Sequence, residues 1–271
     1  MKLIKPDYKP FIERNLMIVN KQSQEIPFKL NPIQNRYITQ DATGRDVILK
    51  ARQQGFSSLI LALFTADFLL KENNRSIIIA DNADNARELL SRVKLFVKSY
   101  EEINKVKVPL KYDTKYELYL EKANNRYTIG TSRNITMGRS KTLNNLHLSE
   151  FAFYDHPEEI LSGAVQAVVP DGRVIIETTA NSYNFFKDFW EECKSGERSF
   201  IPLFYGARGF YTETFLKDKE KELGRQYKQE YPDTDIEAFI SSGSNYFNVD
   251  GLKWHLTNVS QVMDEGVIYG F

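Results

Sequence analysis

Hydrophobic positions in this chain follow two patterns that alternate from about residue 46 to residue 205. Short, continuous apolar runs are typical of strands that are buried on both faces of a sheet. Longer segments place apolar residues three or four positions apart, which is typical of helices packed on one side. The runs predict strands at 47–49, 76–80, 116–121, 127–131, 146–148, 174–176 and 200–204, and the spaced segments predict helices at 58–71, 83–100, 157–168 and 183–193. Strands that alternate with helices predict an α/β fold with a mostly parallel central sheet flanked by helices.

The segments on either side of this alternation differ from it in composition. Residues 1–30 are mixed and polar, and we expect an N-terminal extension that packs on the core or on a lid. Residues 31–205 form the predicted core. Residues 206–245 are charged and helical, which predicts a small lid or linker subdomain whose charges lie on a solvated helix face. Residues 246–271 are expected to form a C-terminal linker.

Composition narrows the class of protein. The chain has 271 residues, of which 42% are hydrophobic, so it suits one large folded domain and argues against wholesale disorder. Its formal net charge of +0 gives no overall basic excess for nucleic acid, although a local basic patch stays open. The single cysteine, Cys193, makes no internal disulfide, and the three histidines are scattered, so we expect a reducing cytoplasm and no zinc site. The longest apolar stretch, 59–70, is too short to span a bilayer.

A polar loop between the first core strand and the first core helix carries the strongest chemical signal. Strand, glycine-containing loop, hydroxyl and helix follow one another as in a phosphate-binding loop, which aims backbone N–H groups at phosphates. Lys50 occupies the place of the first glycine in the usual spelling, and Phe56 occupies the place of the usual lysine. A lysine at the front of the loop can still reach the β- and γ-phosphates of ATP. An ordinary basic turn is the alternative for this stretch, Lys50-Ala51-Arg52-Gln53-Gln54-Gly55-Phe56-Ser57-Ser58.

Two further strand ends carry polar residues, and ligands of parallel α/β sheets lie beyond the carboxyl ends of strands. Glu150 follows the strand at 146–148, where a carboxylate polarises the attacking water of a nucleotide hydrolase. Ser149 stands where an aspartate for Mg²⁺ is expected. Thr178, Thr179 and Asn181 follow the strand at 174–176 and have the hydroxyls and amide to sense a γ-phosphate. The alternatives are a strand-end surface carboxylate for Glu150 and a simple helix cap for the other group.

Two weaker candidates lie elsewhere. Arg139, in a glycine-containing loop, has the charge to stabilise a transition state in its own site or in a neighbour's, but an ordinary exposed arginine fits equally well. Gln34, within Asn31-Pro32-Ile33-Gln34, has an amide that suits an adenine edge.

Taken together, these segments resemble the ATPase domain of the large terminase subunit, the genome-packaging motor of tailed bacteriophages. The match extends over about residues 28–245, and the pieces occur in the family's order. The segments that carry it are 31–34, similar to the adenine motif; 50–57, similar to a Walker A with the lysine at its front; 146–153, similar to Walker B; 177–181, similar to the coupling motif; and 229–232 with 237–240, similar to the end of the ATPase region.

The resemblance implies an ASCE-type P-loop NTPase fold and a role for each candidate residue. Nucleotide contacts would come from Gln34, Lys50, Ala51, Arg52, Gln53, Gln54, Gly55, Phe56, Ser57 and Ser58. Ser57 would meet Mg²⁺, and Ser149 would reach the ion through a water. Glu150 would orient the water, and Arg52 or Arg139 would stabilise transition-state charge, Arg139 in trans. The coupling residues would be Thr178, Thr179 and Asn181.

Two departures from the family pattern affect these expectations. Ser149 replaces the usual Walker B aspartate, which leaves direct protein ligation of Mg²⁺ open. Family members also continue into a nuclease domain, whereas we find no convergent acid cluster for two-metal cleavage here, since Asp81 and Asp84 read as solvated loop residues. We therefore expect residues 246–271 to lead toward a nuclease domain that is absent, and no nuclease activity.

The function predicted from the sequence is an ATP-hydrolysing motor domain that drives double-stranded viral DNA into a procapsid, with ATP and Mg²⁺ as cofactors. The resemblance implies the portal protein and the small terminase subunit as partners. It also implies a homo-oligomeric ring on the capsid, a monomer in isolation, no membrane, and the host cytoplasm as the location. Two alternatives stay open: a helicase-like ATPase that remodels nucleic acid, and a non-catalytic P-loop scaffold or adaptor.

Overall fold

A computed structural model of the chain describes residues 8–139, 141–240 and 254. The predicted linker at 246–271 therefore lies almost entirely outside the described residues. None of the described helices is both long enough and apolar enough to cross a membrane.

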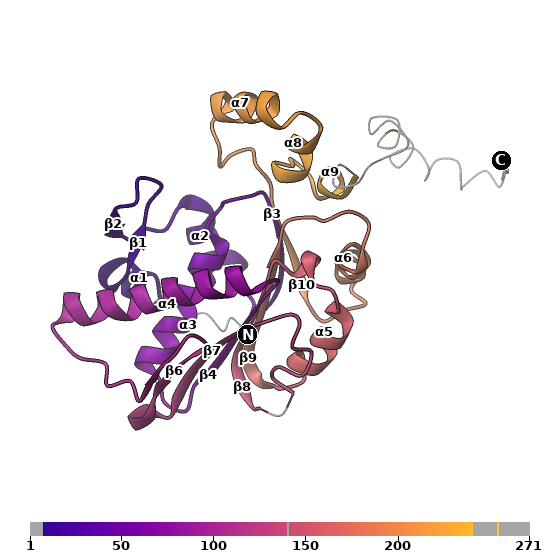
Figure 1. Cartoon of the computed structure of the whole chain (residues 1–271). Coiled ribbons are helices and arrows are strands. Elements are labelled where there is room, and N and C mark those ends of the chain that lie inside the picture. The colour runs from indigo at the N-terminus through magenta and orange to yellow at the C-terminus, as the bar shows by residue number, and fades with distance from the viewer. Residues whose placement is uncertain (1–7, 140, 241–253, 255–271) are drawn as a thin grey trace.

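One sheet of eight strands organises the molecule, in the order β10-β3-β9-β8-β4-β7-β6-β5 (Figure 1). The strands from β10 to β7 pair in parallel, and β6 and β5 continue the sheet antiparallel. The bounds are β3 (Arg45–Lys50), β4 (Arg75–Ala80), β5 (Tyr112–Asp113), β6 (Glu117–Leu120), β7 (Asn125–Thr131), β8 (Leu143–Ser149), β9 (Val168–Thr178) and β10 (Ile201–Tyr205). The predicted mostly parallel α/β sheet is confirmed.

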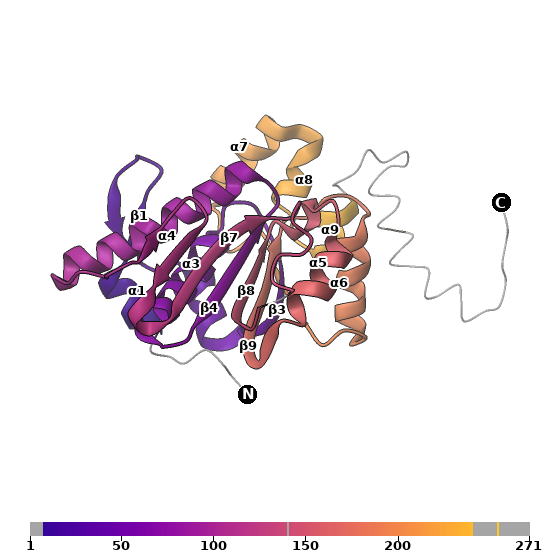
Figure 2. The ribbon, with the colours of Figure 1, turned by 60° about the horizontal axis from the view of Figure 1, so that its bottom comes forward.

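Helices cover both faces of this sheet, as Figure 2 shows from below. One face carries α1 (Tyr8–Asn15), α3 (Phe56–Leu70) and α4 (Ala83–Asn104), and the other carries α5 (Pro157–Val165) and α6 (Phe185–Ser195). Side chains alternate between the two faces: Ile48 joins the core under α3, whereas Val47 and Leu49 join the core under α5 and α6. This alternation is why the central strands read as unbroken apolar runs.

Shorter elements connect or extend these layers. A small hairpin, β1 (Met17–Val19) with β2 (Glu25–Pro27), follows α1 and contacts α4. The chain enters β3 through α2 (Pro32–Arg36) and the π-helix η1 (Tyr37–Asp41). Three 3₁₀ turns are η2 (Glu121–Ala123), η3 (Phe151–Phe153) and η4 (Gly224–Gln226). After β10 the chain forms α7 (Glu213–Leu223), α8 (Tyr227–Glu230) and α9 (Asp235–Ile240), which lie above the sheet in Figure 1.

The predicted boundaries differ from the observed ones most at the start of β9. The helix expected over 157–168 ends at Val165, and β9 begins at Val168, six residues before the expected strand at 174–176. Pro170 disfavours helix for the residue before it and cannot continue a helical ladder, so the chain turns extended there. The pairing of β9 with β8 then shifts register between Leu143 and Asn145. The apolar run marked only the part of β9 beyond this irregularity.

Candidate active site

The loop between β3 and α3 lies at the carboxyl edge of the sheet. It turns through left-handed backbone at Gln53 (φ 59°) and Gly55 (φ 80°). A Cβ on Gly55 would lie 2.7 Å from the side-chain Nε2 of Gln34. Any other residue at this position would therefore be strained by the left-handed backbone and would also clash with Gln34. Gly55 also caps α3 without a side-chain hydrogen bond, which leaves the start of the helix open toward an anion.

Two of the loop amides are already bonded within the protein. The amide of Ala51 donates to the carbonyl of Tyr205 at 2.9 Å, and the amide of Arg52 donates to the carbonyl of Glu230 at 2.9 Å. The carboxamide of Gln54 donates to the carbonyl of Gly206 at 2.7 Å. The front of the loop is thus fixed to β10 and to the segment after it, and amide contacts to phosphate would come from Gln53 onward.

Lys50, the last residue of β3, is the centre of the site. Its side chain is 6% exposed, and its Nζ lies 3.3 Å from Glu150 Oε1 and 3.1 Å from Glu177 Oε2. Burial on its own lowers the pKa of Lys50, but the charges of the two carboxylates outweigh it and hold the pKa above its ordinary value. Lys50 is therefore a fully charged cation below the surface of the loop.

Glu177 is the first residue of the segment similar to the coupling motif and was assigned no task of its own, but it contacts Lys50, Ser57, Ser149 and His147. It is fully buried on β9, and its Oε1 accepts hydrogen bonds from Ser57 Oγ at 2.8 Å and Ser149 Oγ at 2.7 Å. His147 Nε2 lies 3.4 Å from the same oxygen. Burial raises the pKa of Glu177, but the charge of Lys50 and the contact with His147 outweigh it, so the pKa lies well below its ordinary value.

Glu150 comes directly after β8 and has a side chain that is 29% exposed. Its backbone is left-handed (φ 55°, ψ 47°), which turns the chain sharply from the strand into η3. Its Oε2 accepts a hydrogen bond from the amide of Thr179 at 3.3 Å. Burial raises the pKa of Glu150 above its ordinary value, although the charge of Lys50 opposes the shift. Such a carboxylate takes up a proton more readily than a free one.

The predicted coupling residues connect β9 to the turn after Glu150. Thr178 Oγ1 accepts a hydrogen bond from the amide of Ala152 at 3.2 Å, and Asn181 Nδ2 donates to the carbonyl of Ala152 at 3.2 Å. Thr179 reaches Glu150 through its backbone amide. A displacement of Glu150 would therefore shift the end of β9, and a displacement of the end of β9 would shift Glu150.

Gln34 and Asn31 brace the loop from α2. Each side chain hydrogen-bonds the other's backbone, and Gln34 Nε2 donates to the carbonyl of Gly55 at 2.8 Å. Asn31 Nδ2 donates to the carbonyl of Gln54 at 3.0 Å. The amide of Gln34 is thus engaged with the loop, so a contact with adenine would require these hydrogen bonds to be exchanged.

Phe56 does not line the open side of the loop. Its ring is buried among aromatic neighbours, with its centroid 4.7 Å from that of Tyr205 and 5.7 Å from that of Tyr37. Ser58 likewise turns away, and its hydroxyl accepts from Arg92 of α4 at 3.3 Å. For these two predicted nucleotide contacts the backbone amides are the groups that a phosphate would meet.

The two candidate arginines lie apart from Lys50. Arg52 is 57% exposed and pairs with Glu230, Nη1 to Oε2, at 3.0 Å. Arg139 is exposed, donates to the carbonyl of Glu159 at 3.2 Å and packs over Gly163 of α5. No contact among the described residues joins Arg139 to Lys50 or Glu150, so within one chain the structure does not bring this arginine to the site.

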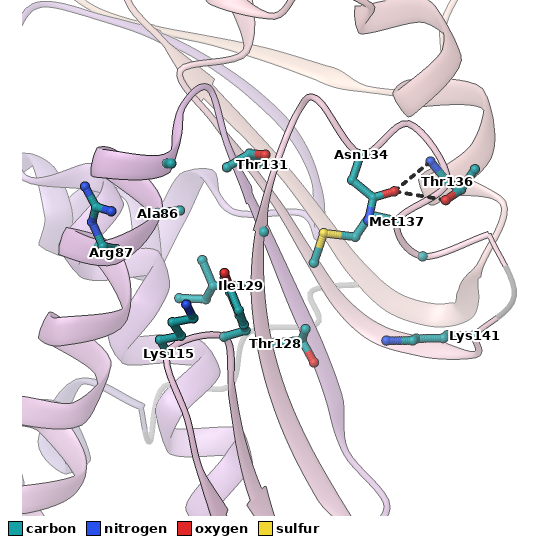
Figure 3. A pocket seen from close by; sticks show the side chains of 14 residues that line it. Ala86, Arg87, Lys115, Thr128, Ile129, Thr131, Asn134, Thr136, Met137 and Lys141 are labelled. Atoms are coloured by element: carbon teal, nitrogen blue, oxygen red, sulfur yellow. Dashed lines mark hydrogen bonds between the residues drawn. The ribbon is translucent and has the colours of Figure 1, made fainter.

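Two cavities adjoin these elements. One of about 420 Å³ lies beside Arg52 and Gln53 and is walled by residues of α7 and by Tyr231. Another of about 500 Å³ lies at the end of β7 (Figure 3), with cations from three segments around it: Arg87, Lys115 and Lys141. None of its described lining residues is acidic. Although the net charge of the chain is +0, this cavity is therefore a locally basic hollow, defined by Arg87, Lys115 and Lys141. Lys50 does not line it.

Among the described residues, no group of three or more His, Cys, Asp and Glu side chains is arranged to hold a metal ion by itself. The donors around Lys50 are nonetheless oxygens, from Ser57, Ser149, Glu150 and Glu177. Oxygen donors with few protein ligands suit Mg²⁺, which keeps several waters and binds through phosphates. The residues present fit a nucleotide-bound magnesium ion better than an independent metal centre.

Glu177 and His147 were not predicted as site residues, because Glu177 ends an apolar run and His147 interrupts one. A usable signal was the period of two along the strands. Counting from Ile175, Glu177 faces the same side of the sheet, and so do His147 and Ser149 on the neighbouring strand, where Ser149 pairs with Glu177. Polar residues in step with each other on adjacent strands predict a shared site.

Solved structures of phage large terminases are similar to this chain over most of its length. The large terminase ATPase domain of Thermus phage P74-26 has a TM-score of 0.58 and 18% identity, and the match covers 75% of this chain and 93% of that one. The large terminase of bacteriophage HK97 has a TM-score of 0.65 and 15% identity, with 86% of this chain and 55% of that one covered. A large terminase from a thermophilic bacteriophage, solved in complex with ADP, has a TM-score of 0.56 and 12% identity, with 73% and 51% covered.

The chain thus spans about half the length of the HK97 protein and of the terminase solved with ADP. A scan against protein-family models and a search of curated proteins found no match. The chain has the α/β fold of the ATPase domains of phage large terminases, with a mostly parallel central sheet flanked by helices.

Proposed function

We propose that this chain is an ATP-hydrolysing motor domain that drives the translocation of double-stranded viral DNA into a procapsid. The observation that supports this most is the meeting of Lys50, from the front of the β3–α3 loop, with Glu150, from the end of β8, at 3.3 Å. A buried cation and a carboxylate with a raised pKa, next to an open helix start, are the parts that phosphoryl transfer to water requires. The large terminase of a thermophilic bacteriophage that was solved with ADP and with ATP-γ-S supports a nucleotide as the ligand.

Each residue has a task in this proposal. Lys50 and the loop amides from Gln53 onward would bind the phosphates, with Lys50 exchanging its carboxylate partners for phosphate oxygens. Glu150 would orient the attacking water and accept its proton, which its raised pKa favours. Ser57 would direct its hydroxyl toward Mg²⁺. When bound, Mg²⁺ supplies charge neutralisation on the phosphates.

The coupling residues and the arginines would connect hydrolysis to movement. Thr178, Thr179 and Asn181 would pass a shift of Glu150 to the end of β9. Arg52 would pass it to the segment at 206–245, because it bonds Glu230 through both its backbone and its side chain. The exposure of Arg139 supports a role in trans, in which it reaches the site of a neighbouring copy in a ring.

Partners follow from the same proposal. The chain would assemble as a homo-oligomeric ring with the portal protein and would work with the small terminase subunit, in the host cytoplasm. The basic hollow at Arg87, Lys115 and Lys141 supports contact with the phosphates of double-stranded DNA, because none of its described lining residues is acidic. Arg87 also pairs with Asp84, which lies outside the lining.

The test is a calorimetric titration of Mg-ATP into the wild type and into Lys50→Ala. Micromolar binding, on the order of −8 kcal/mol, is expected for the wild type and is expected to be lost in the variant. Lys107→Ala removes a lysine whose side chain is 85% exposed and serves as the matched control, with binding unchanged. Equal binding by Lys50→Ala and the wild type would contradict the assignment of Lys50.

The two alternatives predict different outcomes. A helicase-like ATPase predicts strand separation, and no stimulation by the portal or small terminase subunit. A scaffold or adaptor predicts nucleotide binding with no turnover in any assembly.

A further inference from the structure

We propose that Glu177 supplies the carboxylate directed at the nucleotide-bound divalent cation, in place of the aspartate that Ser149 replaces. This inference rests on the proposed function, since it concerns the metal that accompanies ATP. The acidic group has in effect moved sideways, from the end of β8 to the neighbouring strand β9.

The register of the sheet brings the two positions together. Ser149 of β8 pairs directly with Glu177 of β9, and the serine hydroxyl donates to Glu177 Oε1 at 2.7 Å. A serine is shorter than an aspartate, so it leaves space for the longer glutamate side chain to reach across from the next strand. Ser149, which lacks the charge of an aspartate, thus holds the charged Glu177 in place through a hydrogen bond.

The second contact of Glu177 points to the metal position of the loop. Ser57 occupies the hydroxyl position of the phosphate-binding loop, and its Oγ donates to Glu177 Oε1 at 2.8 Å. In such sites the hydroxyl and a nearby carboxylate act on the same ion, directly or through water. Of the two carboxylates at Lys50, Glu177 is the one that the Ser57 hydroxyl contacts, which distinguishes its task from that of Glu150.

The charge and burial of Glu177 explain why a second cation beside it would be stabilising. Lys50 carries one positive charge and faces two carboxylates, Glu150 and Glu177. Glu177 is fully buried, and its Oε2 has no hydrogen bond of good geometry although Lys50 Nζ lies 3.1 Å away. In this structure Lys50 compensates the buried charge of Glu177, and that compensation is lost when Lys50 turns to phosphate unless another cation replaces it. A hard divalent ion such as Mg²⁺ or Mn²⁺ matches the oxygen donors.

The rival explanation is that Glu177 is only a counter-ion that keeps Lys50 charged. The two explanations differ in what they predict without metal. A counter-ion predicts that Glu177→Gln weakens nucleotide binding both with and without metal. A metal-directed carboxylate predicts that Glu177→Gln weakens the binding of the metal ion and does not weaken the binding of nucleotide in the absence of metal.

The experiment titrates Mn²⁺ into the full chain saturated with ATP-γ-S and follows free Mn²⁺ by electron paramagnetic resonance. Glu177→Gln is expected to weaken Mn²⁺ binding by about 10- to 100-fold. Binding of ATP-γ-S in EDTA, measured by calorimetry, is expected to stay the same or to strengthen, because Lys50 has one competitor fewer. The double variant Ser149→Asp/Glu177→Gln returns the carboxylate to β8 and is expected to recover most of the Mn²⁺ affinity.

Glu150→Gln is the comparison variant, because it removes the same charge from the other partner of Lys50. It is expected to change Mn²⁺ affinity by less than about 3-fold, since its effect is a longer-range charge effect in a partly solvated site. Unchanged Mn²⁺ affinity in Glu177→Gln, or equal losses in the two single variants, would overturn the inference while the proposed function stands. No binding of ATP-γ-S by the wild type would overturn both. If Glu177→Gln does not fold, Glu177→Asp draws the carboxylate away from Ser57 and is expected to show a loss of about 10-fold.

Discussion

Two buried ion clusters lie at opposite ends of α3, on the same face of the sheet. The upper cluster, at the start of the helix, consists of Lys50, Ser57, Ser149, Glu150, Glu177 and His147. The lower cluster, at the end of the helix, consists of Asp67, Lys71, Asn145, Arg173 and Tyr8. Both draw residues from α3, β8 and β9, to which the upper cluster adds Lys50 of β3 and the lower cluster adds Tyr8 of α1.

The lower cluster is closed around one carboxylate. Asp67 is approached by the Tyr8 hydroxyl, by Lys71 Nζ at 2.8 Å, by Asn145 Nδ2 at 3.1 Å and by the guanidinium of Arg173. Burial raises the pKa of Asp67, but the charges of Arg173 and Lys71 outweigh it and hold the pKa below its ordinary value. Cations exceed carboxylates here, and the acceptor is saturated.

The upper cluster has the opposite balance. Two carboxylates share one lysine, and neither ring nitrogen of His147 has a hydrogen-bond partner of good geometry. Phe64 separates the clusters: its ring meets His147 edge-on at 6.4 Å, and the guanidinium carbon of Arg173 lies 5.2 Å from its centre. In the lower cluster the carboxylate of Asp67 is saturated, and the buried atom left without a hydrogen bond is a donor, Arg173 Nη1. The comparison teaches that a cluster with surplus positive charge around a saturated carboxylate fixes the end of a helix, whereas one with surplus negative charge is prepared for a cationic ligand.

The largest expected effect comes from breaking the lower cluster. Arg173→Met leaves Asp67 buried without its guanidinium partner and is expected to lower the free energy of unfolding by about 3–5 kcal/mol, measured by urea denaturation. The double variant Arg173→Met/Asp67→Asn is expected to recover more than half of the loss. Arg87→Met, at an exposed pair on α4, is the control and is expected to cost less than about 1 kcal/mol. If Arg173→Met lowered the free energy of unfolding by less than about 1 kcal/mol, the lower cluster would not stabilise the fold.

Glu150→Gln tests the chemical role of the upper cluster. Loss of the group that accepts the proton is expected to slow single-turnover ATP hydrolysis in the presence of DNA by about 10²- to 10⁴-fold, with nucleotide affinity nearly unchanged. Glu158→Gln, an exposed carboxylate on α5, is the control and keeps the wild-type rate. A decrease of less than about 10-fold would remove Glu150 from the role of general base.

Lys50→Ala is expected to give a pH-dependent loss of stability. In the wild type the lowered pKa of Glu177 means that its charge stabilises the fold above its unfolded pKa, and that this stability is lost as the pH falls through the folded value. Without Lys50, two carboxylates face each other, their pKa values rise above the ordinary range, and their charges oppose folding at high pH. The loss is expected to be about 3 kcal/mol near pH 8 and clearly smaller near pH 5, by urea denaturation at both pH values. A loss that grows on acidification would contradict this arrangement of charges.

The smallest effect is expected at the rim of the site. Arg52 and Glu230 form an ion pair, but the arginine side chain is 57% exposed and solvent screens the attraction. Arg52→Ala is expected to lower the free energy of unfolding by less than about 1 kcal/mol. A double-mutant cycle with Glu230→Gln measures the pair itself, and a coupling above about 2 kcal/mol would show that this pair belongs with the buried clusters.

The sequence predicted the fold well because the core strands bury apolar side chains on both faces. It also located Lys50 and Glu150, since both follow apolar strands and the ends of parallel strands meet at one edge. It could not predict Glu177 or the lower cluster in the same way. The partners of Glu177 lie 28 positions away at Ser149 and 120 positions away at Ser57. The period of two gives the face of each strand, but the sequence does not record which strands are neighbours or in which register they pair. The start of β9 was predicted wrongly for a related reason, because the irregular pairing of β9 with β8 leaves no periodic signal in the sequence.

The aromatic packing of Phe56 has an evolutionary consequence. Its ring fills the position of the usual lysine and is held between Tyr37 and Tyr205. A substitution that placed lysine there would bury a charge among rings, while Lys50 still occupied the site from the other side. We therefore expect that a change from this loop to the usual spelling would pass through a less stable intermediate for as long as Tyr37 and Tyr205 pack on position 56.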